Sequence, residues 1–324
     1  TLLPIPNAPL DDVPDGLDEE SNIVIRTSEG LTETHGNAHW DVATELDILD
    51  LEAGASIAGA RFYVLKGKGA KLQRALASWM LDIQTEVHGY TEIDPPLLVR
   101  GETMTGSGNL PKFKDNLYRD GDSDLWLVPT AEVALNGLHQ GQIIDPDKLP
   151  LKYVAQTPSF RKEQTSAGRD VRGIKRVHQF EKVEMFRYVE PETSDEMLEE
   201  MLGEAESLCA RLGLTYRVLQ LCAGDIGFQS AKTYDIEVWS PGCAEWLEVS
   251  SISTCTDFQA RRNGTRYRPE VGASTKLPHT LNGSGLALPR IWIAVIENGL
   301  QEDGSIVIPE VLVPYTGWDR IEAN

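Results

Sequence analysis

The stretch 160–186 reads FRKEQTSAGRDVRGIKRVHQFEKVEMF and predicts a β-hairpin closed by a long polar loop. Both ends alternate between polar and apolar residues, and two glycines lie between them. Because strand side chains repeat every two residues, Arg161 and Glu163 are expected on one face, as are Phe180 and Glu184. A sheet surface with a cation, an aromatic ring and carboxylates suits a nucleotide and a ligand that carries an ammonium group.

Three further segments predict strands, and no helix is expected between them. They span 215–221, 232–239 and 245–254. Consecutive strands without intervening helices favour an antiparallel sheet. Apolar residues at helical spacing predict two long amphipathic helices, over 69–88, with Val87 on the inward stripe, and over 193–212. Alternation over 61–65 predicts a short strand, and 101–118 is expected to be a glycine-rich loop. The combination indicates an α+β fold.

Helix starts supply the next candidate residues. The sequence T-x-x-E at 193–196 predicts a capping box. Thr130 is a candidate cap for a short helix, and Glu132 lies in the first turn of that helix, where the helix dipole favours a carboxylate. Arg290 lies near the start of a helix predicted over 289–299. A cation is unfavourable at that end, so Arg290 and the helix start together indicate an anion site.

The composition is that of a globular protein with a strongly acidic balance. Of the 324 residues, 41% are hydrophobic and 25% charged, and the net charge is −20. Such a charge opposes general binding of nucleic acids, whose phosphates need basic partners. Residues 161–182, however, hold seven basic and three acidic side chains. A second basic cluster consists of Arg261, Arg262, Arg266 and Arg268.

Several other classes of protein are disfavoured. No apolar run approaches the roughly 20 residues of a membrane helix, and no export signal is evident. The four cysteines form no C-x-x-C pair, so reduced thiols in a cytoplasmic protein are expected. The lesser alternative is a zinc site that uses Cys222, Cys243 or Cys255. Neither the Walker pattern nor a G-x-G-x-x-G dinucleotide fingerprint occurs.

Taken in order, six segments resemble the class II aminoacyl-tRNA synthetases, and within them the seryl-tRNA synthetases. The segments are TAE (130–132), FRKE (160–163), RVHQFEKVEMF (176–186), YDIEVW (234–239), EVSSISTCTDFQARR (248–262) and HTLNGSGLALPR (279–290). The resemblance covers nearly the whole chain. It implies one catalytic domain over 1–324, with a less regular segment over 1–60 and an antiparallel-sheet core over 61–324 that is flanked by helices.

The resemblance implies a site for ATP. Arg161 would hold the α-phosphate and the reacting carboxylate, and Arg290 would face the γ-phosphate; these two are the expected catalytic residues. Glu163 would lie near the adenine amino group, and Phe180 would stack on adenine. Forming an acyl-adenylate needs positioning and neutralisation of charge more than a general base. Two guanidiniums and a bound Mg²⁺ would supply both.

Glu248 and Ser251 match the positions that bind Mg²⁺ and the phosphates of ATP. They are three residues apart, so a regular strand would point them to opposite faces. Either a bulge lies between them or one of them acts through its main chain.

The resemblance also implies a pocket for L-serine. Its residues would be Thr130, Glu132, Glu184 and Ser284, with Arg161 at the carboxylate of the substrate. A buried group paired with the serine hydroxyl would exclude alanine, because alanine would leave that group unpaired. Some stand-alone relatives hold zinc with cysteines in this pocket, so these residues favour a zinc-free, serine-specific type.

Partners follow from the same resemblance. Prolines at 95–96 match a motif that in the family belongs to a homodimer interface. The basic loop, with Arg169, Arg172, Lys175 and Arg176, would meet the acceptor end of tRNA(Ser). No heptad run corresponds to the coiled-coil arm of seryl-tRNA synthetases, which indicates either a truncated synthetase or a natural stand-alone homologue. Serine activation is therefore expected to persist, with weak charging of tRNA.

Two alternatives remain open. One is a stand-alone homologue that activates serine or another small amino acid and transfers it to a carrier protein or another non-tRNA acceptor. The other is a non-catalytic regulatory or RNA-binding module. The second is disfavoured because both arginines, Arg161 and Arg290, are present.

Overall fold

The computed structural model describes residues 3–163 and 172–322; Arg169 of the basic loop lies outside them. At its centre is an eight-stranded sheet in which all neighbouring strands are antiparallel except β4 and β8. In spatial order the strands are β1 (Ile23–Thr27), β10 (Tyr216–Gln220), β11 (Lys232–Ser240), β12 (Glu245–Thr256), β14 (His279–Ala287), β9 (Gln179–Val189), β8 (Leu151–Phe160) and β4 (Thr91–Glu92). The predicted antiparallel α+β fold is confirmed, and the hairpin forms β8 and β9.

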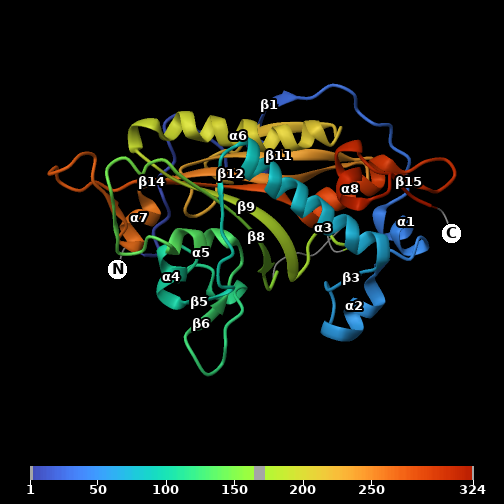
Figure 1. Ribbon diagram of the computed structural model, residues 1–324, viewed down its shortest axis with the longest axis horizontal. Helices are drawn as coiled ribbons and strands as arrows, with labels where there is room; N and C mark the ends of the chain where they lie inside the picture. Colours follow the sequence, from blue (N-terminus) through green and yellow to red (C-terminus); the bar gives the residue numbers. More distant parts are fainter. Residues whose placement is uncertain (1–2, 164–171, 323–324) are drawn as a thin grey trace.

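Three long helices cover one face of this sheet (Figure 1). They are α3 (Gly67–Asp82), α6 (Ser194–Arg211) and α8 (Leu288–Gly299). Val183 and Met185 of β9 point into the largest hydrophobic core, between these helices and the sheet. Strand alternation then turns the residues between them, such as Glu184, to the opposite face.

Shorter helices lie on the side of that opposite face. They are α4 (Gly101–Gly106), α5 (Ala131–Gly137) and α7 (Phe258–Asn263). Helices α5 and α7 pack on the sheet, and α4 packs on those two. Phe186 and Tyr188 of β9 pack with Ala131 and Leu135 of α5 in a second apolar cluster. Lys182 and Glu184 continue the same row of β9 toward the hairpin turn, so the polar residues lie beside this cluster.

The remaining elements are short. The helices are α1 (His39–Glu45), α2 (Leu51–Ala58), α9 (Val313–Thr316), η1 (Glu19–Ser21), η3 (Lys114–Asn116), η5 (Pro191–Thr193) and η6 (Glu310–Leu312). The strand pairs are β2 (Leu49–Asp50) with β3 (Val64–Leu65), β5 (Leu98–Arg100) with β6 (Leu125–Leu127), β7 (Ile143–Ile144) with β13 (Arg266–Tyr267), and β15 (Ile306–Val307) with β16 (Arg320–Ile321). Residues 1–60, expected to be less regular than the core, contain η1, β1, α1, β2 and α2.

Some local expectations are wrong. Thr193 forms no side-chain cap; its hydroxyl instead donates to the carbonyl of Glu190 in a 3₁₀ turn, 3.1 Å away. Arg61 has a φ of +65°, so the strand expected over 61–65 shortens to Val64–Leu65. The glycine-rich stretch after residue 100 begins with α4 rather than a loop.

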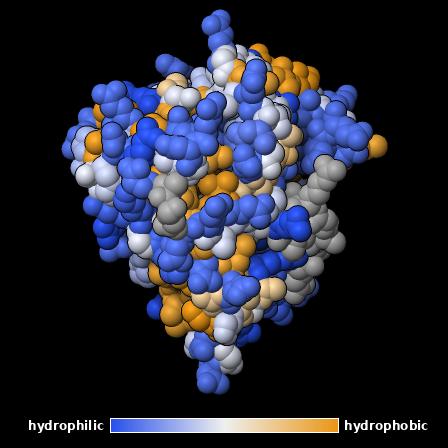
Figure 2. Space-filling view, turned by 90° about the vertical axis from the view of Figure 1, so that its right-hand side faces the viewer, coloured by the Kyte–Doolittle hydropathy of each residue, from blue (hydrophilic) through white to orange (hydrophobic). Residues whose placement is uncertain are grey.

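The helix predicted over 69–88 forms as α3, but its last turn is a π-helix, η2 (Ile83–Val87). That turn changes the helical period, and Val87, expected inside, is 56% exposed. Seen from the end that carries α1 and α2, the surface is mostly hydrophilic with apolar patches between (Figure 2). Among the described residues, no helix is both long enough and apolar enough to cross a bilayer.

Candidate active site

The register of the central strands places the first site residues. Glu184 of β9 is opposite Ala155 of β8 and opposite Ser284 of β14. Opposed residues of an antiparallel pair point to the same face. Glu184 and Ser284 are far apart in the sequence, but this pairing places both of them on the polar face of the sheet.

Arg161 lies directly after β8, which ends at Phe160, so strand alternation does not place it. Its main-chain N–H donates to the carbonyl of His178 over 2.9 Å, which closes the hairpin. Its Nε donates to the carbonyl of Pro129, 3.2 Å away. The guanidinium stands over the ring of Phe180, 5.1 Å from the centroid. The predicted phosphate ligand and the predicted adenine platform are thus neighbours.

Glu163 lies two residues further on, in a left-handed conformation with a φ of +40°. Its carbonyl accepts a hydrogen bond from Nη1 of Arg61 over 2.5 Å. The carbonyl of Arg61 in turn accepts from the N–H of His178, 3.2 Å away. A non-glycine residue at positive φ is strained and needs such supporting contacts. The segment before α3 therefore holds the start of the loop in place.

A β-bulge in β12 brings Glu248 and Ser251 to one face. Glu237 of β11 is opposite Glu248 and the residue before Glu237 is opposite Ser250, which leaves Val249 as the extra residue. Val249 is buried in the hydrophobic core, whereas Glu248 is exposed to solvent. One inserted residue restores a shared face to side chains three positions apart. Of the two explanations left open by the sequence, the structure has the bulge.

Asp235 of β11 is a neighbour that the sequence reasoning missed as a site residue. It is opposite Ser251 in the sheet. Burial and then the negative charge of Glu248 raise the pKa of Asp235 well above its usual value, although a hydrogen bond with Ser251 opposes the shift. Its Oδ1 has no hydrogen-bond partner among the described residues. The available signal was the alternation of Asp235 with Glu237 along the strand.

Arg290 lies in the first turn of α8, as predicted. Its Nη1 donates to the carbonyl of Glu248 over 2.6 Å and lies 3.2 Å from the carboxylate of the same residue. Its Nε donates to the carbonyl of Lys175, 3.3 Å away. Partial loss of water around the Glu248 carboxylate favours its protonated form, but the charge of Arg290 and its hydrogen bond outweigh this effect and lower the pKa of Glu248.

Thr130 and Glu132 open α5, and the predicted cap is present. The Thr130 hydroxyl oxygen accepts from the N–H of Glu132, 3.3 Å away. The Glu132 carboxylate is buried and accepts from the amides of Gln259 at 2.6 Å and Asn282 at 3.3 Å. Burial and then the negative charge of Glu184 raise the pKa of Glu132 to about 7. Gln259 and Asn282 were not anticipated.

Lys182 was also missed as a site residue. It lies on the same face of β9 as Glu184, and the two form an ion pair. Its Nζ donates to the hydroxyl oxygen of Thr130 over 2.8 Å, and its charge lowers the pKa of Glu132. An ammonium group therefore contacts two of the groups that the resemblance assigns to the amino acid.

Arg161 links the two groups of residues. Its positive charge lowers the pKa of Glu132, which lies with Thr130 and Glu184, and also the pKa of Glu248, which lies with Ser251 and Arg290. One side of this centre carries two guanidiniums and a pair of close carboxyl groups, suited to a polyphosphate and a divalent cation. The other side carries buried acidic and hydroxyl groups, suited to a small molecule with an ammonium group.

Comparison with known proteins agrees with this arrangement. Residues 112–299 match the model of the tRNA synthetase class II core domain (G, H, P, S and T). A serine--tRNA ligase from Thermomicrobium roseum is 56% identical over 321 residues, which cover 98% of this chain and 72% of that protein. A serine--tRNA ligase from Roseiflexus sp. is 56% identical over 98% of this chain and 75% of its own length.

Solved structures show the same relationship. Seryl-tRNA synthetase from Pyrococcus horikoshii, complexed with ATP, superposes with a TM-score of 0.96 at 39% identity, covering 100% of this chain and 77% of that one. Cytoplasmic serine--tRNA ligase from Naegleria fowleri, complexed with AMP, gives a TM-score of 0.93 at 32% identity over 100% of this chain and 78% of that one. The chain therefore belongs to the serine--tRNA ligases, a family of class II aminoacyl-tRNA synthetases.

Proposed function

We propose that this chain activates L-serine with ATP to form seryl-adenylate and then transfers the seryl group to tRNA(Ser). The observation that carries the proposal is the position of Arg161, whose guanidinium lies over the Phe180 ring, 5.1 Å from the centroid, and whose Nε donates to the carbonyl of Pro129 beside Thr130 over 3.2 Å. A cation at that place can bind the serine carboxylate and the α-phosphate together. The names of the relatives support the choice of serine and of tRNA.

In the first step a serine carboxylate oxygen attacks the α-phosphorus of ATP, and the bond from that phosphorus to the β-phosphate oxygen breaks to release pyrophosphate. Arg161 neutralises the α-phosphate and orients the attacking carboxylate. Arg290 binds the γ-phosphate, Phe180 stacks on adenine, and Glu163 lies at its amino group. The arrangement acts through positioning and charge, as is usual for transfer at phosphorus.

Mg²⁺ would be held by Glu248 and Ser251 together with the phosphates of ATP. The donor set fits: Asp235 adds a buried carboxyl oxygen that lacks a hydrogen-bond partner among the described residues, next to Glu248. Hard oxygen ligands of this kind suit Mg²⁺. When bound, the ion offsets negative charge on the phosphates.

Serine would be bound by Thr130, Glu132, Glu184 and Ser284. The two carboxylates attract its ammonium group, and one polar group of the pocket pairs with its hydroxyl. These groups are largely buried, with Glu132 3% and Glu184 1% exposed. Alanine would leave the partner of the hydroxyl unpaired, which costs binding free energy.

The acceptor end of tRNA would reach the adenylate past the loop between β8 and β9. A cavity of ≈ 380 Å³ beside the C-terminal end of this loop is lined by Trp40, Arg61, Phe62 and Arg172, among others. The Arg172 guanidinium stands 5.9 Å from the Trp40 ring centroid. Aromatic rings with arginines suit single-stranded nucleotides. The terminal ribose hydroxyl would then attack the seryl carbonyl carbon, and AMP would leave.

The enzyme would act as a cytoplasmic homodimer. Prolines 95–96 lie between β4, at the sheet edge, and β5, where the resemblance implies the interface. Val87 and Leu98 nearby in the chain are 56% and 48% exposed. Light scattering that gives the mass of one chain at micromolar concentration would contradict the dimer.

The decisive experiment is ATP–pyrophosphate exchange with serine, glycine, alanine and threonine in turn. Exchange with serine alone is expected, and Arg161→Ala should lower it by about 10²–10³-fold with an unchanged circular dichroism spectrum. Absence of exchange with every amino acid would refute the proposal. Charging of tRNA(Ser), measured alongside, separates this acceptor from a carrier protein.

A further inference from the structure

Helix α8 contacts the end of the loop between β8 and β9 at two places. Arg290 and Glu297 are seven residues apart, close to two helical turns, so both side chains lie on one side of α8. We call residues 173–175 the loop stem. Arg290 donates a hydrogen bond to Lys175, the last residue of the stem. Glu297 contacts His39, and His39 in turn contacts the stem at Ile174.

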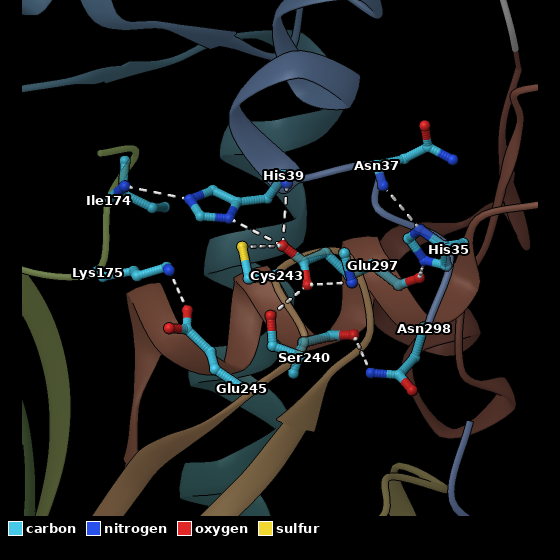
Figure 3. A network of polar contacts seen from close by, with 12 residues as sticks. His35, Asn37, His39, Ile174, Lys175, Ser240, Cys243, Glu245, Glu297 and Asn298 are labelled. Atoms are coloured by element: carbon cyan, nitrogen blue, oxygen red, sulfur yellow. Dashed lines mark hydrogen bonds and ion pairs between the residues drawn. The ribbon is translucent and has the colours of Figure 1, made fainter. Parts of the chain in front are cut away.

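Glu297 is the centre of a buried polar network (Figure 3). It is 1% exposed and accepts five hydrogen bonds, from the main-chain N–H groups of His39 and Gly242, His39 Nδ1, the Ser240 hydroxyl and the Cys243 thiol. Burial favours the protonated carboxyl, but the hydrogen bonds from His39 and Ser240 outweigh it and lower the pKa of Glu297. The carboxylate is therefore charged and fully engaged.

His39, which is 0% exposed, connects Glu297 to the loop stem. Its Nδ1 lies 3.0 Å from Oε1 of Glu297, and its Nε2 accepts the main-chain N–H of Ile174 over 3.3 Å. An N–H group can only donate, so Nε2 is unprotonated and the proton is on Nδ1. Burial lowers the pKa of His39, which keeps the ring neutral. Glu297 thus selects the tautomer that binds the stem.

The stem passes directly against this ring. Gly173 has a φ of +68°, and a Cβ atom at this position would lie 2.1 Å from Nε2 of His39. Only glycine allows both the conformation and the approach. One residue beyond Ile174, the Lys175 carbonyl accepts the hydrogen bond from Nε of Arg290.

The same cluster has the residue types of a metal site, since ligand atoms of His39, Cys243 and Glu297 lie within 4.8 Å of one another. The contacts within the cluster favour a hydrogen-bonded network around Glu297 over a metal site. Nδ1 and the thiol each direct a hydrogen at Glu297, and burial raises the pKa of Cys243 to about 11, against the thiolate that a metal needs.

We propose that His39 is a positioning residue for Arg290. Held by Glu297, its ring fixes the loop stem at Ile174, and the stem carbonyl of Lys175 then orients the Arg290 guanidinium toward the phosphates of ATP. The inference rests on the proposed role of Arg290 in binding ATP. It predicts that substitution of His39, a buried side chain outside the site, changes KM for ATP more than KM for serine.

The test uses His39→Ala in the full chain, with KM for ATP, KM for serine and kcat measured by pyrophosphate exchange. KM for ATP should rise about tenfold while KM for serine changes less than about twofold. In an Arg290→Ala background, His39→Ala should add less than about twofold, because the group it positions is gone. If the double variant raises KM for ATP by the product of the two single-variant effects, the inference is wrong.

Two further variants distinguish a loss of positioning from a general loss of stability. Gly173→Ala keeps His39 and Glu297 in the sequence but forces the stem and the His39 ring apart, and the same selective rise in KM for ATP is expected. Tyr90→Phe is the matched control, because its hydroxyl bonds Glu204 at 2.7 Å and Arg187 at 2.8 Å in another buried network. It should lower the melting temperature and leave KM for ATP unchanged.

The outcomes also separate this inference from the proposed function. If Arg290→Ala leaves KM for ATP unchanged, the role of Arg290 itself is wrong. If Arg290→Ala raises KM for ATP but His39→Ala and Gly173→Ala do not, only the positioning role of His39 is refuted.

Discussion

Arg290 holds Glu248 at two points, the main-chain carbonyl at 2.6 Å and the carboxylate at 3.2 Å. One residue of β12 thus binds the start of α8 with its backbone and presents a carboxylate whose pKa Arg290 lowers. The backbone contact does not depend on the side chain. The structural and the electrostatic parts of the pair can therefore be separated by substitution.

Glu248→Gln should keep the bond from Arg290 to the main chain and remove only the charge. The concentration of Mg²⁺ that gives half-maximal exchange should rise by about tenfold or more, because an amide is a poorer ligand than a carboxylate. Titration of exchange activity with Mg²⁺ measures this. Glu206→Gln, at an exposed ion pair with Arg26, is the control. An unchanged Mg²⁺ requirement in Glu248→Gln would remove Glu248 from the metal site.

Glu132 should make both stability and serine binding depend on pH. Its pKa is about 7 in the folded protein and 4.5 ordinarily, so between these values the folded state holds more protons than the unfolded state. Stability should therefore fall as pH rises from about 4.5 to about 7. Binding of the serine ammonium should strengthen over the upper part of this range, because Glu132 becomes charged.

Glu132→Gln should flatten both profiles. Urea unfolding at several pH values gives the first, and KM for serine against pH gives the second. Parallel profiles for the parent and Glu132→Gln would show that another group titrates.

Lys182→Met should weaken serine binding selectively. The ammonium of Lys182 binds Thr130, pairs with Glu184 and lowers the pKa of Glu132. Without it Glu132 is more protonated at neutral pH, and KM for serine should rise by about tenfold while KM for ATP stays within about twofold. Lys66→Met, at a solvent-exposed ion pair with Asp47, is the control and should change neither. If Lys182→Met instead tightens serine binding, Lys182 competes with the substrate.

Most of the fold could be predicted from the sequence, because the periodic patterns of strands and helices are local. Alternation predicted β8, β9 and the three strands from 215 to 254, and the helical stripe predicted α3. Thr130 and Arg290 were found at helix starts for the same reason. Boundaries failed where a single conformation broke the pattern, as at Arg61 with its positive φ.

Side chains that join the site from distant elements were harder to predict. Gln259 and Asn282 bond Glu132 from α7 and β14, and no local pattern relates them to α5. The sequence could not decide whether a bulge brings Glu248 and Ser251 to one face, because the bulge at Val249 is defined by the pairing of β12 with β11. His39 and Glu297 are 258 residues apart, and their contact depends on the packing of α1 against α8.

Asp235→Asn should stabilise the protein and weaken metal binding together. Burial and the charge of Glu248 raise the pKa of Asp235, so the folded state resists its ionisation and loses stability as pH rises above the ordinary value of 3.8. The amide removes that cost, and the free energy of unfolding at neutral pH should increase by on the order of 1 kcal/mol. The half-saturating concentration of Mg²⁺ should rise in the same variant, because a candidate ligand is lost. Such a trade of stability for function is common in active sites. A less stable variant with an unchanged Mg²⁺ requirement would make Asp235 a structural residue of β11 instead.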